Sequence, residues 1–137
     1  MPKVFTSKTQ KIGELGESIA IKFLMKQGFQ IIDRNHTKKW GEIDIVAEKN
    51  RKLYFIEVKS VSREGLQNVT HETTSGEYRP EDNMHPWKLK RLSRTIQTYL
   101  ISQKVPDDRE WQVDLLVVLM DMKAKKARVK VVSDIIL

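Results

Sequence analysis

"GEIDIVAEKNRKLYFIEVKS", residues 41–60, contains two apolar runs separated by a polar segment at residues 48–51. This pattern predicts two antiparallel strands joined by a tight turn. Charged residues nevertheless stand inside both runs: Glu42 and Asp44 in the first, Glu57 and Lys59 in the second. The register of the hairpin determines which of these charges meet.

A two-residue loop at residues 50–51 pairs residues whose numbers add up to 101. Asp44 then faces Glu57, and Glu42 faces Lys59. The other face of the hairpin becomes an apolar layer made of Ile43, Ile45, Ala47, Ile56 and Val58. A slip of one residue would mix the two layers, so burial of one face should fix this register.

Two carboxylates that face each other across a sheet repel, and burial strengthens the repulsion. A shared proton or a divalent cation held by oxygen ligands would offset it. Mg²⁺ on two carboxylates and several waters can bind a phosphate oxygen and lower the pKa of a bound water. Lys59 could orient that water or stabilise negative charge on the phosphate. The alternative is a solvated strand face whose charges form surface ion pairs.

The length of 137 residues accommodates one compact domain, residues 1–137. No apolar run is long enough to cross a membrane, and the N-terminal residues lack the apolar core of a secretory signal. We therefore expect a cytoplasmic protein without membrane contact. The absence of cysteine excludes disulfides, thiolate zinc sites and cysteine nucleophiles.

Lys and Arg number 25 against 18 Asp and Glu, which gives a net charge of +7. Clustered basic residues gain free energy by releasing counterions from phosphates. The charge balance therefore favours a polyanionic partner such as nucleic acid, although it does not identify one.

Helical spacing of Ile12, Leu15, Ile19 and Phe23 predicts a first helix from about residue 8 to residue 27, widened by Ala20 and Leu24. A short strand at 29–35 precedes the hairpin. Residues 62–85 are polar, mildly acidic and without period, so we expect a mobile loop there.

Pro86 predicts the start of a second helix that ends near residue 103, with one buried face made of Leu89, Leu92, Ile96, Tyr99 and Leu100. Residues 111–122 are nearly all apolar and predict a strand covered on both faces, and residues 127–133 predict a last strand. The order α-β-β-β-α-β-β implies an α/β fold with a central mixed sheet flanked by helices.

An Asp followed across a hairpin by Glu-x-Lys resembles the site of the PD-(D/E)XK nuclease superfamily. More closely, "GELGESIAIKFLMKQGFQIIDRN", "GEIDIVA" and "FIEVKS", in this order, resemble the YraN-like uncharacterised protein family over most of the chain. The resemblance implies a restriction-endonuclease-like three-layer fold. It also implies a Mg²⁺- (or Mn²⁺-) dependent endonuclease that hydrolyses phosphodiester bonds in nucleic acid, with DNA favoured over RNA and branched or structured DNA as a candidate substrate.

By the same resemblance, Asp44, Glu57 and Lys59 are the catalytic residues, and Glu17 joins Asp44 and Glu57 as a metal ligand. Glu42 would support these ligands. The corresponding glutamate of archaeal Holliday-junction resolvases lies on their first helix, and because those resolvases act as dimers, a homodimer is implied. Glu17 borders the apolar face of the first helix, so its carboxylate can reach inward, but a first-helix acid favoured by the helix dipole is the alternative.

Lys88 and Arg91, in a K-x-x-R-L pattern on the second helix, match family positions that could contact phosphate, although a basic helix face can also be merely solvated. Two features depart from the family: a long segment between Lys59 and Lys88, and Gln112 where arginine is common. Asp114 is either a partnered structural acid or a support for a basic site residue.

Two other functions stay open. A nucleic-acid-binding or assembly module could keep this fold without cleaving its ligand. A protein-interaction domain would use the acidic loop at residues 62–85 as its contact region.

Overall fold

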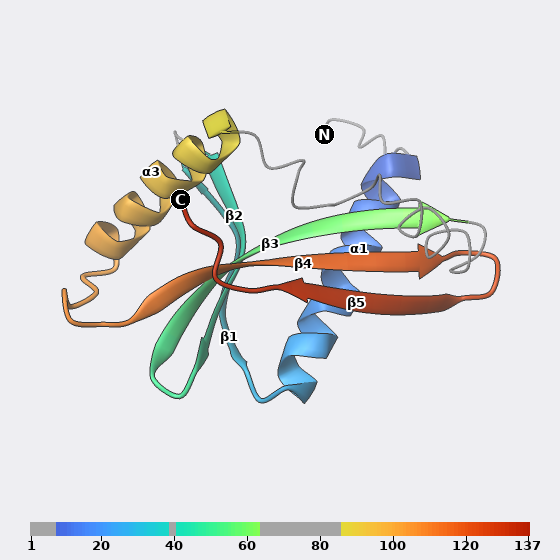
Figure 1. The fold of residues 1–137 in the computed structure, drawn as a ribbon, viewed down its shortest axis with the longest axis horizontal. Helices are drawn as coiled ribbons and strands as arrows, with labels where there is room; N and C mark the ends of the chain where they lie inside the picture. Colours follow the sequence, from blue (N-terminus) through green and yellow to red (C-terminus); the bar gives the residue numbers. More distant parts are fainter. Residues whose placement is uncertain (1–7, 39–40, 64–85) are drawn as a thin grey trace, which may run out of the picture.

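The computed structural model describes residues 8–38, 41–63 and 86–137, which form a mixed five-stranded sheet and two helices (Figure 1). In chain order the elements are α1 (Lys8–Lys26), β1 (Gln30–Lys38), β2 (Gly41–Lys49), β3 (Lys52–Arg63), α3 (Pro86–Ser102), β4 (Trp111–Asp121) and β5 (Lys126–Val132). This order and the α/β class confirm the prediction from the sequence. In these described ranges, no helix is long and apolar enough to span a membrane.

The sheet has the strand order β1-β2-β3-β4-β5, and every neighbouring pair is antiparallel except β3 and β4. Parallel strands need a long crossover connection, and α3 lies within that connection. Strand β4 is buried from Val113 to Asp121, as its apolar sequence predicts.

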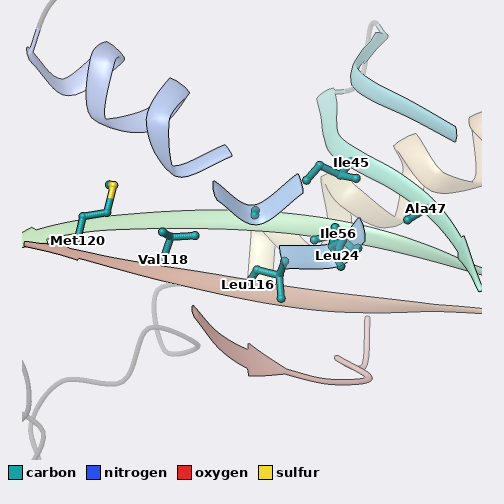
Figure 2. Close-up of a cluster of buried hydrophobic side chains, with 8 residues drawn as sticks. Leu24, Ile45, Ala47, Ile56, Leu116, Val118 and Met120 are labelled. Atoms are coloured by element: carbon teal, nitrogen blue, oxygen red, sulfur yellow. The ribbon is translucent and has the colours of Figure 1, made fainter. Parts of the chain in front are cut away.

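Helix α1 covers one face of the sheet. Ala20 and Leu24 of α1 pack with side chains of β2, β3 and β4, namely Ile45, Ala47, Ile56, Leu116, Val118 and Met120 (Figure 2). Helix α3 packs on a second cluster, in which Leu92, Ile96 and Tyr99 meet Ile43, Val46, Leu53, Phe55 and Val113. Because Val46 and Phe55 alternate with Ile45 and Ile56 along their strands, the two helices cover opposite faces.

The prediction for the buried face of α1 was wrong for Leu15, whereas Ile12, Ile19 and Phe23 pack against the core as predicted. Leu15 is 41% exposed, whereas Ala20 and Leu24 are buried. The cause is a close approach between α1 and β3: a Cβ atom on Gly16 would lie 1.9 Å from Ser60 Oγ. No side chain fits at position 16 against Ser60, and Gly16, Ala20 and Leu24 form the line of α1 that faces the sheet.

The hairpin register is confirmed. Strands β2 and β3 pair from Lys49 with Lys52 to Ile45 with Ile56. The loop consists of the two residues 50–51, with φ angles of 53° and 66°. Positive φ at both positions is typical of a type I′ turn, whose twist matches that of the flanking strands.

The predicted apolar layer is correct for Ile45, Ala47 and Ile56 but wrong for Ile43. Ile43 packs under α3, on the opposite face from Ile45. It lies beyond Ile45, the last residue of β2 that pairs with β3, so the ladder that enforces strict alternation has ended there.

Two strands are longer than their sequences predict. Strand β1 runs to Lys38 because it pairs with β2 along its whole length, despite a bulge between Ile31 and Asp33. Strand β3 runs to Arg63 along β4, so the predicted loop at 62–85 begins two residues too early. The rest of that loop, residues 64–85, lies outside the described residues. The helix expected from Pro86 to about residue 103 is confirmed as Pro86–Ser102.

Candidate active site

Strands β2 and β3 part at Asp44. Their ladder ends at Ile45 with Ile56, and one residue further the backbone N–H of Val58 donates to Asp44 Oδ2 at 2.8 Å. A side-chain carboxylate therefore satisfies a β3 amide where a backbone carbonyl would continue the ladder. We call this position the fork.

Asp44 and Glu57 interact directly at the fork. Burial, and secondly the charge of Glu57, raise the pKa of Asp44 to about 8, although the hydrogen bond from Val58 opposes the shift. Burial also raises the pKa of Glu57, while Lys88 and a hydrogen bond with Asp44 lower it. The fold thus holds two acids where both cannot ionise without a cost.

Helix α1 brings Glu17 to the same place. Its Oε1 atom is buried and has no hydrogen-bond partner, since Arg34 Nη2 of β1 is 3.7 Å away. Burial raises the pKa of Glu17, the charge of Arg34 and a side-chain hydrogen bond with Asn35 lower it, and the negative charge of Glu42 raises it. The contact between Gly16 and Ser60 fixes this turn of α1 against β3 and so positions Glu17.

Glu42 is exposed, and its charge raises the pKa values of Glu17, Asp44 and Glu57. Its predicted pairing with Lys59 is wrong, because the β2–β3 ladder ends at Ile45 before reaching it. Glu42 instead lies opposite Thr37 of β1.

The acids open into two grooves. A groove of about 380 Å³ on the α3 side is lined by Glu42, Glu57, Trp87, Lys88 and Arg91, among others. A second groove of about 420 Å³, next to α1, is lined among others by Glu17, Asp44, Lys59 and Ser60. The predicted metal ligands and the predicted catalytic lysine thus line these two grooves, with Glu57 on the α3 side and Glu17, Asp44 and Lys59 on the α1 side.

The predicted phosphate-contacting residues Lys88 and Arg91 lie on the α3-side groove. Lys88 Nζ is 3.7 Å from Glu57 Oε1, and the Lys88 side chain is 43% exposed. The Arg91 guanidinium lies 5.6 Å from the centre of the Trp87 ring, which is itself largely exposed. This opening therefore combines two cations with an aromatic face that a nucleic-acid base could stack on.

The chemistry of the donors suits a hard cation. Carboxylate oxygens are the ligands that Mg²⁺ and Mn²⁺ prefer, and one buried oxygen of Glu17 has no hydrogen-bond partner. Over residues 8–38, 41–63 and 86–137, no three Asp, Glu or His side chains converge closely enough to hold a metal together. The arrangement therefore fits a cation held directly by Asp44 and Glu57, with water completing its shell and Glu17 nearby.

Asp114 is a structural acid. Its Oδ1 accepts hydrogen bonds from Gln112 Nε2 at 2.7 Å and from the backbone of Asp134 at 2.9 Å. The adjacent N–H of Ile135 donates to the carbonyl of Val113 at 2.7 Å. Asp114 thus fastens the C-terminal segment to β4, and Gln112 supplies it with a second hydrogen-bond donor.

Two contributors to the site were missed from the sequence. The positive charge of Arg34, on β1, opposes the negative charge of Glu17, and the side chain of Ser60, on β3, lies against Gly16 of α1. Both contacts join segments far apart in the chain, and neither residue type stands out in its own segment, so no local signal could have found them.

Residues 16–133, which include all the predicted site residues, match the model of uncharacterised protein family UPF0102. A UPF0102 protein of Campylobacter jejuni is 37% identical over 110 residues, which cover 80% of this chain and 85% of that protein. A Campylobacter fetus relative is 37% identical over 109 residues, covering 80% and 84%.

The structure of Pyrococcus furiosus SfsA in complex with Ca²⁺ aligns with 93% of this chain and 64% of that chain, at 16% identity and a TM-score of 0.37. The chain thus spans just under two thirds of SfsA, and a likeness at this score carries no argument. The family match and the Campylobacter relatives are decisive: the chain belongs to the UPF0102 (YraN-like) family.

Proposed function

We propose that this protein is a metal-dependent nuclease that hydrolyses phosphodiester bonds in nucleic acid, with DNA favoured over RNA. The observation that carries the proposal is the fork, where Asp44 and Glu57 are held together in partial burial with Glu17 beside them. An Asp and a Glu-x-Lys on adjoining strands also underlie the resemblance to the PD-(D/E)XK superfamily, to which we assign the site.

The cost of the acidic cluster supports a cation-binding role. Like charges at close range in a partly buried site destabilise the fold, and packing alone gains nothing from them. A divalent cation would remove that cost, and it would be held by Asp44 and Glu57, with Glu17 and Glu42 adding negative charge. When bound, such a cation supplies Lewis-acid activation of a phosphate oxygen and a water of lowered pKa.

The chain's own cations complete the chemistry. Lys59 lines the α1-side groove with Asp44, and its ammonium would orient the attacking water or stabilise charge that develops on the phosphate. Lys88 now pairs with Glu57 at 3.7 Å. With Glu57 holding a cation instead, Lys88 and Arg91 would be available to bind a substrate phosphate in the α3-side groove.

The same ion pair favours a second candidate, a non-catalytic nucleic-acid-binding module. Lys88 could neutralise Glu57 permanently, in the way a bound cation would in an enzyme. In that protein the acids would never hold a metal, and the basic residues would only bind phosphates.

A cleavage assay separates the two. Branched, flapped, nicked, single-stranded and duplex DNA, with matching RNA, would be incubated with Mg²⁺, Mn²⁺ or EDTA. We expect cleavage by the wild type that EDTA, Asp44→Asn and Lys59→Met each abolish, while Lys22→Met, an exposed lysine on α1, leaves it intact.

Cleavage that survives in both site variants would point to a contaminating nuclease. Binding without cleavage under every metal would favour the module. The implied homodimer and the cytoplasmic location stay predictions, and sedimentation equilibrium would test the former.

A further inference from the structure

The β4–β5 hairpin is the most basic segment of the described chain outside the site. Residues 122–132 contain no acid, and their five basic side chains are all exposed: Lys123, Lys125, Lys126, Arg128 and Lys130. Strand β5 is also an edge of the sheet. In Figure 1 the turn of this hairpin lies at the opposite end of the molecule from α3.

Three of these cations, on β5, lie on the same face of the sheet as residues 57 and 59 of β3. Val129 packs in the cluster under α1, and Val132 packs in a cluster on the other face with Val61 of β3. Alternation along β5 puts the side chains at positions 126, 128 and 130 on the face of Val132. Alternation along β3 places Glu57 and Lys59 on the same face as Val61, and Lys59 also lines the α1-side groove beside the fork.

The registers of β3 with β4 and of β4 with β5 place Lys130 in the same row as Lys59, two strands away. Lys59 is opposite Val117 of β4, and Val117 is opposite Lys130, so the three form one row. At about 4.8 Å per strand, the backbones of Lys59 and Lys130 are ~10 Å apart. Arg128 follows about 6.8 Å along the strand, close to two base steps of a nucleic-acid strand at ~3.4 Å each.

No carboxylate faces these two cations across the ladder. Arg128 lies opposite Leu119, and Lys130 lies opposite Val117, whereas Lys126 lies opposite Asp121. Both side chains are exposed and therefore accessible to a ligand. Lysine on an edge strand also prevents edge-to-edge pairing of sheets, and this role alone would account for a basic edge.

We propose that the exposed basic side chains of β5 dock the phosphate backbone of duplex DNA beside the fork, with Arg128 and Lys130 as the contacts nearest the site. The proposal rests on the proposed function, in that nucleic acid is the substrate. The duplex would then be held from two sides, by the hairpin and by Lys88 and Arg91 of α3.

The test compares two variants with the same net charge. Arg128→Gln/Lys130→Gln removes two hairpin charges, and Lys22→Gln/Lys26→Gln removes two exposed charges from α1. Binding of fluorescent duplex DNA is measured by anisotropy in EDTA over a range of salt concentrations. The hairpin variant should weaken binding, and its slope of log K against log salt should flatten by about 1.8, at ~0.9 per lost phosphate contact.

The α1 variant should keep the wild-type affinity and slope. Equal losses in the two variants, or no loss in the hairpin variant, would overturn the proposal. So would tighter, hairpin-dependent binding of an RNA duplex of the same sequence. Thermal unfolding of both variants confirms that each is folded.

The absence of cysteine permits a direct proximity test. A photoreactive benzophenone attached to Lys123→Cys should crosslink to duplex DNA, and the same group on Lys22→Cys should not. Crosslinking with no cleavage under any metal would leave the docking surface standing and defeat the nuclease proposal. Cleavage without crosslinking from the hairpin would defeat the docking surface and leave the nuclease proposal standing.

Discussion

Replacing Asp44 with asparagine separates the cost of the acidic pair from the packing around it. In Asp44→Asn the side-chain amide oxygen can still accept the Val58 N–H, and the amide nitrogen can donate to Glu57. In the wild type without metal, the folded carboxyl keeps its proton up to about pH 8, whereas the ordinary pKa is 3.8. A raised pKa means stability that is present at low pH and is lost as the pH rises toward 8.

The size of the effect follows from the difference between the ordinary pKa of 3.8 and the folded pKa of about 8. Each pH unit between the two pKa values costs ~1.4 kcal/mol, so the wild type should lose up to ~4 kcal/mol between pH 5 and pH 8 relative to the variant. Water entering the groove of about 420 Å³ beside Asp44 lessens the loss. We therefore expect the stability advantage of Asp44→Asn over the wild type to grow by roughly 1–4 kcal/mol from pH 5 to pH 8.

Urea denaturation followed by tryptophan fluorescence, in EDTA at pH 5 and pH 8, measures this difference. Asp108→Asn, at an exposed turn, is the matched control and should show no such dependence on pH. A variant that is less stable than the wild type at pH 8, or a difference that does not change with pH, would refute the reasoning. Addition of Mg²⁺ at pH 8 should raise the melting temperature of the wild type and leave Asp44→Asn unchanged.

Three further substitutions test the framework that holds the site. Gly16→Ala should lower the free energy of unfolding by about 1–3 kcal/mol, because its methyl group would meet Ser60 Oγ; failure of Ser60→Gly to restore stability in the double variant would contradict this cause. Arg51 has a φ of 66°, which glycine adopts without strain, so Arg51→Gly should stabilise the fold by about 0.4–1 kcal/mol and raise its melting temperature. An unchanged or lower melting temperature would count against a strained turn. Asp114→Ala should cost about 1–3 kcal/mol and speed amide exchange at Asp134, and unaltered exchange there would show that Asp114 does not hold the C-terminal segment.

The hairpin could be predicted because its information is local. A two-residue loop at residues 50–51 sets the register, and an apolar layer on one face leaves only one alignment of the two strands. That register was enough to bring Asp44 and Glu57 together. It failed at Ile43, where the ladder had already ended.

The surroundings of the pair depend on contacts that no local pattern encodes. The 3.6-residue period of apolar residues located α1 but placed Leu15 on its buried face. The pattern gives weight to large apolar residues and overlooks Gly16, which lets α1 approach Ser60 of β3. The same limit hid Arg34 beside Glu17. Asp114 was recognisable as an acid in an apolar strand, but its partner at Asp134 lies 20 residues further along the chain.

The central claim is that a divalent cation binds between Asp44 and Glu57. Crystals grown with Mn²⁺, measured near the manganese absorption edge, test it most directly through the anomalous difference map. We predict one strong peak within coordinating distance of both carboxylates, and its loss in Asp44→Asn crystals. A map without a peak at the fork, with Lys88 still paired to Glu57 at saturating Mn²⁺, would contradict it.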